Sequence, residues 1–129
     1  MGHWADRYVG LPAEGKRPCW MLVRQIWHEQ LRFLLPRYDE FDNPQEAISL
    51  NEEGFVAVPI GLEQAYDIAL MKEPIKVKGK VHHHLESHVG IVAARGLVLH
   101  VHEGEFSRIT PIKDLSVSRI FRGPWGVLA

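Results

Sequence analysis

The segment HVGIVAARGLVLHVHEG, residues 88–104, consists of two apolar runs joined by a turn at Ala94-Arg95-Gly96. Strand alternation gives it one wholly apolar face, which must pack on a core: Val89, Ile91, Ala93, Leu97, Leu99 and Val101. The opposite face carries three histidines, His88, His100 and His102, together with Gly90. The segment therefore predicts a β-hairpin with a core face and a histidine face.

The length of the turn decides which of these histidines meet. A three-residue loop with Gly96 in the left-handed region sets His88 opposite His102 and Gly90 opposite His100. A two-residue Arg95-Gly96 turn would put His88 and His100 on different faces. We predict the longer loop, because it keeps apolar and polar residues apart, and we expect Gly90 to leave an open spot beside His88. Histidines on a solvent-facing side of a hairpin are the alternative interpretation.

Upstream of the hairpin, residues 19–35 have the periodicity of an amphipathic helix, with apolar residues at three- and four-residue steps: Leu22, Val23, Ile26, Trp27, Leu31 and Leu34. Pro18 suits the first position of a helix, and Pro36 is expected to end it. A second, short helix is expected within residues 42–50, with Asn43 as N-cap and Pro44 as its first residue.

After Gly54 the chain changes to short apolar or alternating runs separated by turn residues, which is typical of strands: residues 55–61, 66–71, 88–94, 96–102 and 116–121. Helices followed by antiparallel strands indicate an α+β fold, with N-terminal helices packed on an antiparallel β-sheet. A length of 129 residues fits a single domain spanning residues 1–129.

The composition limits the kinds of binding partner that we expect. Fifteen lysines and arginines face sixteen aspartates and glutamates, so we expect no nucleic-acid partner. A short basic run, expected to be a solvated loop or an edge strand, contains Lys72, Lys76, Lys78 and Lys80.

No apolar run approaches the ~20 residues that span a bilayer, so no membrane contact is expected. The first ten residues lack the apolar stretch of a secretory signal, and we expect a chain made in the cytoplasm without a signal peptide.

Cys19 is the one cysteine of the chain, so the fold holds no internal disulfide. It lies in the first turn of the predicted helix, where the helix dipole and free N–H groups lower a thiol pKa and could hold an oxyanion. With His88 as base and His100 or His102 as its orienting partner, Cys19 would complete a nucleophile–base–orienter set. Because Cys19 also falls on the apolar stripe, a small buried hydrophobe is the alternative interpretation.

Several stretches resemble the NlpC/P60 cysteine peptidases, above all the small type found in phage tail-assembly proteins. That family typically reads D-C-W-G-L-V-R at the nucleophile, then P-G-D-I-V-L-F, then H-V-G-I-Y-L-G-x-G-x-x-I-H. The corresponding stretches here are PCWMLVR (18–24), QAYDIALM (64–71) and HVGIVAARGLVLH (88–100). The flanks RYVGLP (7–12) and SVSRIFRGP (116–124) are similar to the entry loop and the closing strand of the family.

The resemblance implies a papain-like NlpC/P60 fold in which Cys19 is the nucleophile, His88 the general base and His100 the third residue, with His102 as its substitute. It implies hydrolysis of the γ-D-glutamyl-diaminopimelate bond of peptidoglycan stem peptides by a phage or prophage tail component. The peptidoglycan peptide and other phage tail proteins would be the partners, and no cofactor or metal is expected.

Three positions depart from the family pattern. Pro18 replaces an aspartate, Met21 replaces a glycine, and Ala13 stands where the entry loop often has a tyrosine, for which Tyr8 is a candidate substitute. These departures keep open an alternative function, a catalytically weak or inactive structural tail-tip protein with the same fold.

A metal site is a third interpretation of the cysteine and the histidines. Its candidate ligands are His82, His83, His84, His88, His100, His102 and Cys19. Their spacing matches no standard zinc pattern, and we expect the run His82-His83-His84 to be a polar loop.

Overall fold

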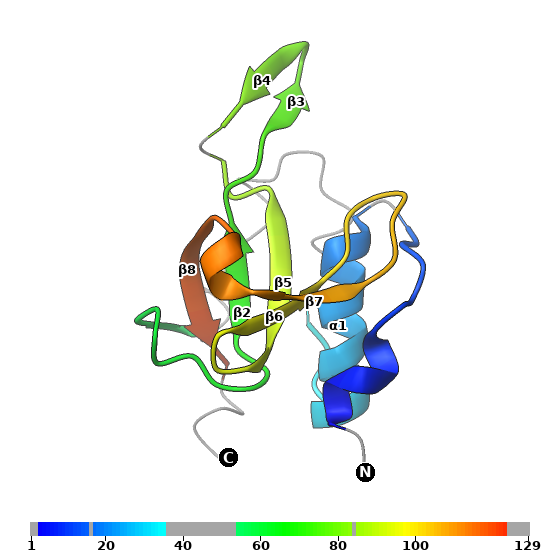
Figure 1. Cartoon of the computed structure of the whole chain (residues 1–129), viewed down its shortest axis with the longest axis vertical. Coiled ribbons are helices and arrows are strands. Elements are labelled where there is room, and N and C mark those ends of the chain that lie inside the picture. Colours follow the sequence, from blue (N-terminus) through cyan, green and yellow to red (C-terminus); the bar gives the residue numbers. More distant parts are fainter. Residues whose placement is uncertain (1–2, 16, 36–53, 84, 124–129) are drawn as a thin grey trace.

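The computed structural model describes residues 3–15, 17–35, 54–83 and 85–123 (Figure 1). Helical segments come first and strands follow, as predicted for an α+β fold. The elements are the 3₁₀ helix η1 (Trp4–Tyr8), helix α1 (Pro18–Leu31), strands β1 (Val56–Val58), β2 (Ile68–Met71), β3 (Ile75–Val77), β4 (Lys80–His82), β5 (His88–Ala94), β6 (Leu97–His100) and β7 (Arg108–Pro111), the 3₁₀ helix η4 (Ile112–Asp114) and strand β8 (Val117–Arg122). The second helix expected within residues 42–50 lies outside the described residues.

Six strands form one antiparallel sheet in the order β1-β8-β2-β5-β6-β7, and helix α1 packs mainly on β5. Strands β3 and β4 form a separate hairpin, which projects beyond the end of the sheet (Figure 1). Exposed lysines of the predicted basic run lie in this hairpin: Lys76, Lys78 and Lys80. Among the described residues, no helix is long and apolar enough to span a membrane.

Helix α1 follows the predicted apolar stripe only in part. Leu22, Val23, Ile26 and Trp27 are buried, whereas Leu34 is 62% exposed. The predicted end at Pro36 is wrong, because Arg32 adopts a left-handed conformation with φ of 57°. Its N–H donates to the carbonyl of His28, which closes the last turn four residues before the proline.

The core between α1 and the sheet contains most of the predicted hairpin face: Val89, Ile91, Ala93, Leu99 and Val101. Leu97 is an exception at 38% exposed. The opposite face is not solvated, because Val98 and Ile120 are buried there and side chains near η4 pack over them, Ile112 and Leu115 among them. The interpretation of the histidines as a solvent-facing set is therefore wrong for His88 and His100, which are 5% and 0% exposed.

The hairpin has the predicted faces but not the predicted loop. Ala94 pairs with Leu97 across a two-residue Arg95-Gly96 turn, and a β-bulge after Val92 then sets Val92 opposite Val98 and Ile91 opposite Leu99. The bulge, rather than a longer loop, thus keeps His88 and His100 on one face.

Gly90 does not leave the open spot that we expected. A Cβ at Gly90 would lie 2.6 Å from Val98 Cγ1, 2.9 Å from the Leu99 carbonyl oxygen and 3.1 Å from His100 Cβ. The space beside His88 is therefore taken by β6, and the glycine lets the two strands approach closely.

The end of β8 is fixed by an ion pair to the segment before β2. Asp67 is 2% exposed and accepts hydrogen bonds from Nε of Arg122 at 3.0 Å and from its Nη2 at 2.9 Å. The Gln64 N–H donates to the same carboxylate at 2.9 Å. This bidentate pair joins the segment before β2 to β8, the last strand in the sequence.

Candidate active site

Cys19 lies directly after Pro18 in the first turn of α1, as predicted. Burial raises the pKa of its thiol, although hydrogen bonding from the backbone of Val89 and Trp20 and the charge of Arg17 oppose that effect. The expected lowering of the thiol pKa at the helix start is therefore wrong, since burial outweighs the helix terminus. The contact with Val89 places the sulfur at the start of β5, next in sequence to His88.

His88 is the first residue of β5, and its side chain is tied to two further strands. Its Nε2 lies 3.0 Å from Nδ1 of His100, the last residue of β6. Nε2 of His100 lies 2.8 Å from Oγ1 of Thr110 on β7. The residue hydrogen-bonded to His88 is thus His100 rather than His102, and Thr110 extends the chain to a strand that the sequence pattern did not predict.

In this series of hydrogen bonds, the imidazoles of His88 and His100 are both neutral at neutral pH. Burial lowers the pKa of His88 to about 3, with further lowering from His102, His100 and Arg108. Burial likewise lowers the pKa of His100 to about 4, and His102 and Arg108 add to this. A neutral imidazole at His88 is able to accept a proton, which a base for the Cys19 thiol must do.

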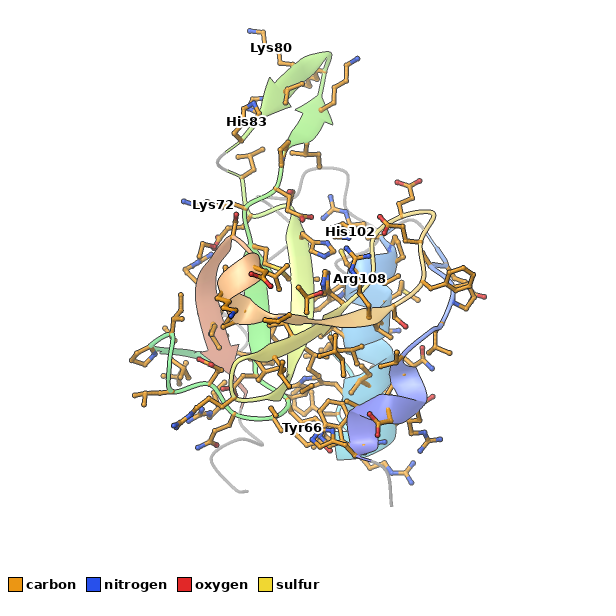
Figure 2. All side chains as sticks on the ribbon, in the orientation of Figure 1. Tyr66, Lys72, Lys80, His83, His102 and Arg108 are labelled. Carbon is orange, nitrogen blue, oxygen red and sulfur yellow. The ribbon has the colours of Figure 1, made fainter. Side chains whose placement is uncertain are left out.

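His102 lies beyond the end of β6 and packs on the face of His88. The two rings are parallel within 5°, with centroids 4.2 Å apart. Nε2 of His102 is 2.9 Å from both carboxylate oxygens of Glu73, and Nδ1 is 3.3 Å from Nη2 of Arg108. Figure 2 shows His102 and Arg108 side by side, far from His83 at the projecting hairpin.

Glu73 also approaches the ring of His88, with Oε1 at 3.6 Å from Nδ1. No sequence pattern points to this carboxylate, because a single glutamate next to a lysine is ordinary on a protein surface. Among the described residues, no hydrogen bond joins Cys19 to His88, whose ring nitrogens face His100 and Glu73 instead. Hydrogen bonds between catalytic groups are often long or poorly aligned without substrate.

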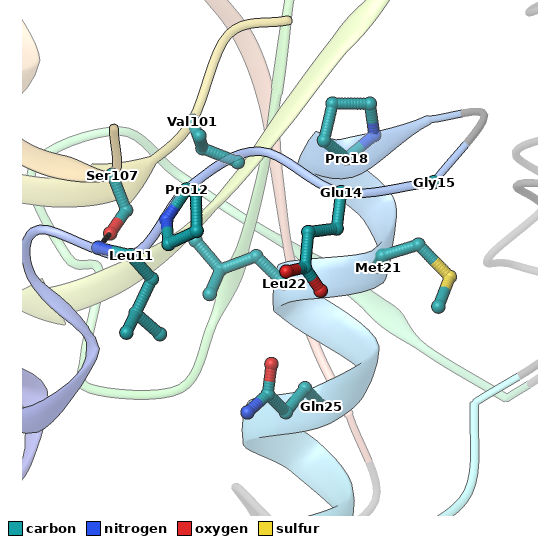
Figure 3. Close-up of a pocket in the computed structure, with 10 residues that line it drawn as sticks. All are labelled: Leu11, Pro12, Glu14, Gly15, Pro18, Met21, Leu22, Gln25, Val101 and Ser107. Atoms are coloured by element: carbon teal, nitrogen blue, oxygen red, sulfur yellow. Dashed lines mark hydrogen bonds between the residues drawn. The ribbon is translucent and has the colours of Figure 1, made fainter. Parts of the chain in front are cut away.

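A pocket of about 420 Å³ opens beside the first two turns of α1 (Figure 3). The segment from Leu11 to Gly15 forms one wall, α1 forms another with Pro18, Met21, Leu22 and Gln25, and Val101 and Ser107 complete it. Met21, which replaces the glycine of the family pattern, is one of the lining residues and stands two positions after Cys19. Pro18, the residue before Cys19, lines the pocket, whereas Cys19 itself is not among the lining residues.

Tyr8 does not belong to this site, against the expectation that it substitutes for the tyrosine missing at Ala13. Its hydroxyl donates to Oε1 of Glu29 at 2.8 Å and accepts from Nε2 of Gln30 at 3.1 Å. Glu29 follows Cys19 by ten residues along α1, which corresponds to about 15 Å of helix. Tyr8 is 2% exposed and packs in the core.

Comparison with solved structures finds chains of similar fold. The structure entitled "Crystal structure of NlpC/p60 domain of peptidoglycan hydrolase SagA" aligns with a TM-score of 0.60 over 92% of each chain, at 16% sequence identity. The chain has the NlpC/p60 fold. No family model and no curated protein matches the sequence. At this identity the likeness establishes the fold of the domain alone.

Proposed function

We propose that this NlpC/p60-fold chain is a cysteine peptidase that hydrolyses an amide bond in peptidoglycan stem peptides. Cys19 is the nucleophile, His88 the general base and His100 the residue that orients it. The observation that carries the proposal is the placement of Cys19 at the start of α1, beside a strand that begins with His88 hydrogen-bonded to a fully buried His100. The structural neighbour, a peptidoglycan hydrolase domain, supports the class of substrate.

The acylation step starts from a neutral thiol and a neutral imidazole. Sγ of Cys19 attacks the scissile carbonyl carbon while its proton moves to Nδ1 of His88. This requires the tautomer in which His88 Nε2–H donates to His100 Nδ1 and His100 Nε2–H donates to Thr110 Oγ1. Backbone N–H groups at the start of α1 stabilise the oxyanion.

Collapse of the tetrahedral intermediate breaks the amide C–N bond, and His88 passes its proton to the leaving amine. A thioester between Cys19 and the acyl group remains. Water then attacks the thioester, its proton moves to His88, and the C–S bond breaks to release a carboxylic acid. The return of the proton to sulfur restores the neutral pair.

The bond we assign is the one between γ-D-glutamate and diaminopimelate. The assignment rests on the resemblance of PCWMLVR and HVGIVAARGLVLH to the NlpC/P60 motifs. The pocket beside the first two turns of α1 suits part of such a peptide, because it offers apolar walls with the Glu14 carboxylate and the Gln25 amide for polar groups. The same resemblance leads us to propose a phage or prophage tail component that is made in the cytoplasm and thins the cell wall locally, with other tail proteins as partners.

The test is digestion of purified peptidoglycan, followed by chromatography and mass spectrometry of the released fragments. We expect fragments with a new amino terminus at diaminopimelate, and none from the Cys19→Ala variant. The His88→Gln variant tests the proposed base. Its matched control is His83→Gln, since His83 is exposed and lies at the projecting hairpin. Equal digestion by the Cys19→Ala variant and the unmodified chain would contradict the assignment.

A second candidate is a structural tail protein that has kept the fold without efficient turnover. The raised pKa of Cys19 and the pocket position of Met21 favour it. Absence of digestion, together with a Cys19 thiol that alkylates no faster than a free cysteine, would select this candidate over the peptidase. Restored digestion in the Met21→Gly variant would show instead that the methionine limits access to the site.

A further inference from the structure

We propose that Glu73 supports His88 as a base: its carboxylate stabilises the imidazolium that forms when His88 takes the proton of Cys19. Glu73 acts through His88 and is in that sense a positioning residue. Its effect on hydrolysis rests on the proposed function. Its effect on the reactivity of the Cys19 thiol is measured without any peptide, so the two can fail separately.

The surroundings of His88 oppose a positive charge on its ring. Burial lowers the pKa of His88 to about 3, and the neighbouring His102, His100 and Arg108 lower it further. Burial also raises the pKa of the Cys19 thiol. Transfer of the thiol proton to His88 therefore creates charges that burial disfavours on both groups, and a negative group near the imidazolium reduces that cost.

Glu73 places a carboxylate beside the ring nitrogen that receives the proton. Its Oε1 lies 3.6 Å from Nδ1 of His88, whereas Nε2 of the same ring is hydrogen-bonded to His100. An opposite charge within about 4–6 Å favours the charged form of a titrating group. Glu73 thus faces the atom at which the new positive charge appears.

The hydrogen bonds of His102 leave the charge of Glu73 unneutralised. Nη2 of Arg108 lies 3.3 Å from Nδ1 of His102. Because a guanidinium only donates, this nitrogen accepts, and Nε2 of His102 carries the ring hydrogen. Both carboxylate oxygens of Glu73 lie 2.9 Å from that Nε2. His102 therefore meets Glu73 as a neutral donor, and the carboxylate keeps its negative charge.

The stacked rings also keep Glu73 out of the path of the proton. A ring N–H lies in the plane of its ring, so the hydrogen bond holds the carboxylate near the plane of His102. That ring is parallel within 5° to the ring of His88, with the centroids 4.2 Å apart. Glu73 therefore lies to one side of the His88 ring, and the in-plane lone pair of Nδ1 stays free for Cys19.

The backbone around Glu73 is tied to neighbouring strands. Oγ of Ser87, the residue before His88, donates to the Glu73 carbonyl at 2.8 Å. The Lys72 N–H donates to the carbonyl of Ser116 at 3.0 Å. The Glu73 side chain is 30% exposed, so solvent weakens the effect of its charge without removing it. The carboxylate is thus held in place beside the base.

The first test is alkylation of Cys19, the one cysteine of the chain, by iodoacetamide at neutral pH. The sulfur displaces iodide, and the rate follows the fraction of chains in which the thiol has passed its proton to His88. We expect Glu73→Gln to slow alkylation by about tenfold, which corresponds to about one pKa unit. In the His88→Gln background the same substitution should change nothing, because no imidazolium forms there. An equal loss in both backgrounds would overturn the proposal.

Two variants of Glu73 separate its charge from its hydrogen bond to His102. Glu73→Gln keeps an acceptor of the same size without the charge, whereas Glu73→Asp keeps the charge on a shorter side chain. We expect Glu73→Asp to react faster than Glu73→Gln. The reverse order, or equal rates, would show a purely structural role. Glu105→Gln is the matched control and should react as the unmodified chain does, because it removes the same charge 3.9 Å from the other nitrogen of His102.

Hydrolysis of the stem peptide gives the corresponding kinetic test. We expect Glu73→Gln to lower kcat by about tenfold and to leave KM unchanged, because the charge acts on proton transfer and touches no substrate. Turnover at the unmodified rate in this variant would overturn the proposal and keep the peptidase. Alkylation that depends on both Glu73 and His88, in a chain that cleaves no peptide, would keep the role of Glu73 and reject the peptidase.

Discussion

Nε2 of His88 lies 3.0 Å from Nδ1 of His100, across strands β5 and β6, which form the histidine face. His100 is fully buried, and its other ring nitrogen is held by Thr110 at 2.8 Å. The ring of His88 is thereby fixed before any substrate arrives, with Nδ1 as its one nitrogen free of this chain of hydrogen bonds. The relationship suits His88 and His100 to the proposed roles of base and orienting residue.

Replacement of His100 by alanine should lower kcat by about 10²-fold or more, because His88 loses the acceptor that fixes its tautomer. His100→Asn keeps an acceptor oxygen on the side chain and should recover part of that loss. Rates are to be measured in EDTA with a soluble stem peptide. Equal activity of the alanine and asparagine variants would show that the hydrogen bond has no positioning role.

Gly90→Ala should destabilise the fold by about 1–3 kcal/mol and reduce turnover, because the new Cβ would push β5 away from β6 between His88 and His100. Urea unfolding gives the free energy of unfolding. Gly79→Ala is the control for a clash. At a φ of +80° its backbone would be strained, but its added Cβ would have no atom within 4 Å. A Gly90→Ala variant as stable and active as the unmodified chain would contradict the close approach of the strands.

The free energy of unfolding should fall as the pH drops from about 6.5 toward 4. In that range the histidines of the unfolded chain, with pKa values near 6.5, bind protons, whereas His88 and His100 stay neutral in the folded chain with pKa values of about 3 and 4. The unfolded state binds more protons, so each histidine lowers stability by up to about 1.4 kcal/mol per pH unit.

Hydrogen bonds also hold the pKa of Glu63 and of Glu86 low, against the effect of burial, but that stabilisation is lost only below about pH 4.3. Urea titrations at pH 7.5, 6.0 and 5.0 therefore isolate the histidines. His88→Gln should flatten the profile, and an unchanged slope in that variant would contradict the burial of a neutral His88.

Arg122→Met should destabilise the fold by about 3 kcal/mol, because Asp67 would be left buried without its charged partner. Arg119→Met is the matched control. Arg119 pairs with Glu86 but is 45% exposed, and such pairs contribute about 0–1 kcal/mol. Similar losses for the two variants would show that the Asp67 pair does not hold the end of β8.

The parts of the site that follow local rules could be predicted from the sequence. Alternation along residues 88–102 gave the two hairpin faces, and Pro18 before the apolar stripe gave the position of Cys19 at the helix start. The turn beside Gly96 and the helix end could not be predicted, because a bulge after Val92 and a left-handed Arg32 have no strong sequence signature.

The sequence pattern also could not predict contacts between segments that lie far apart along the chain. Thr110 reaches His100 through a strand that the pattern did not predict, and Glu73 meets His102 across 29 residues. Tyr8 was misplaced because closeness in sequence to the entry loop does not fix the direction of a side chain. Its hydroxyl reaches the far half of α1 instead.

The most direct test is the rate at which the chain hydrolyses a soluble L-alanyl-γ-D-glutamyl-diaminopimelate peptide in EDTA, with products identified by mass spectrometry. We expect cleavage between D-glutamate and diaminopimelate, none by Cys19→Ala, and a rate lower by at least about 10²-fold for His88→Gln but not for His83→Gln. An unmodified chain that leaves the peptide intact, or a Cys19→Ala variant that cleaves it at the same rate, would contradict the assignment of Cys19 and His88 as the catalytic pair.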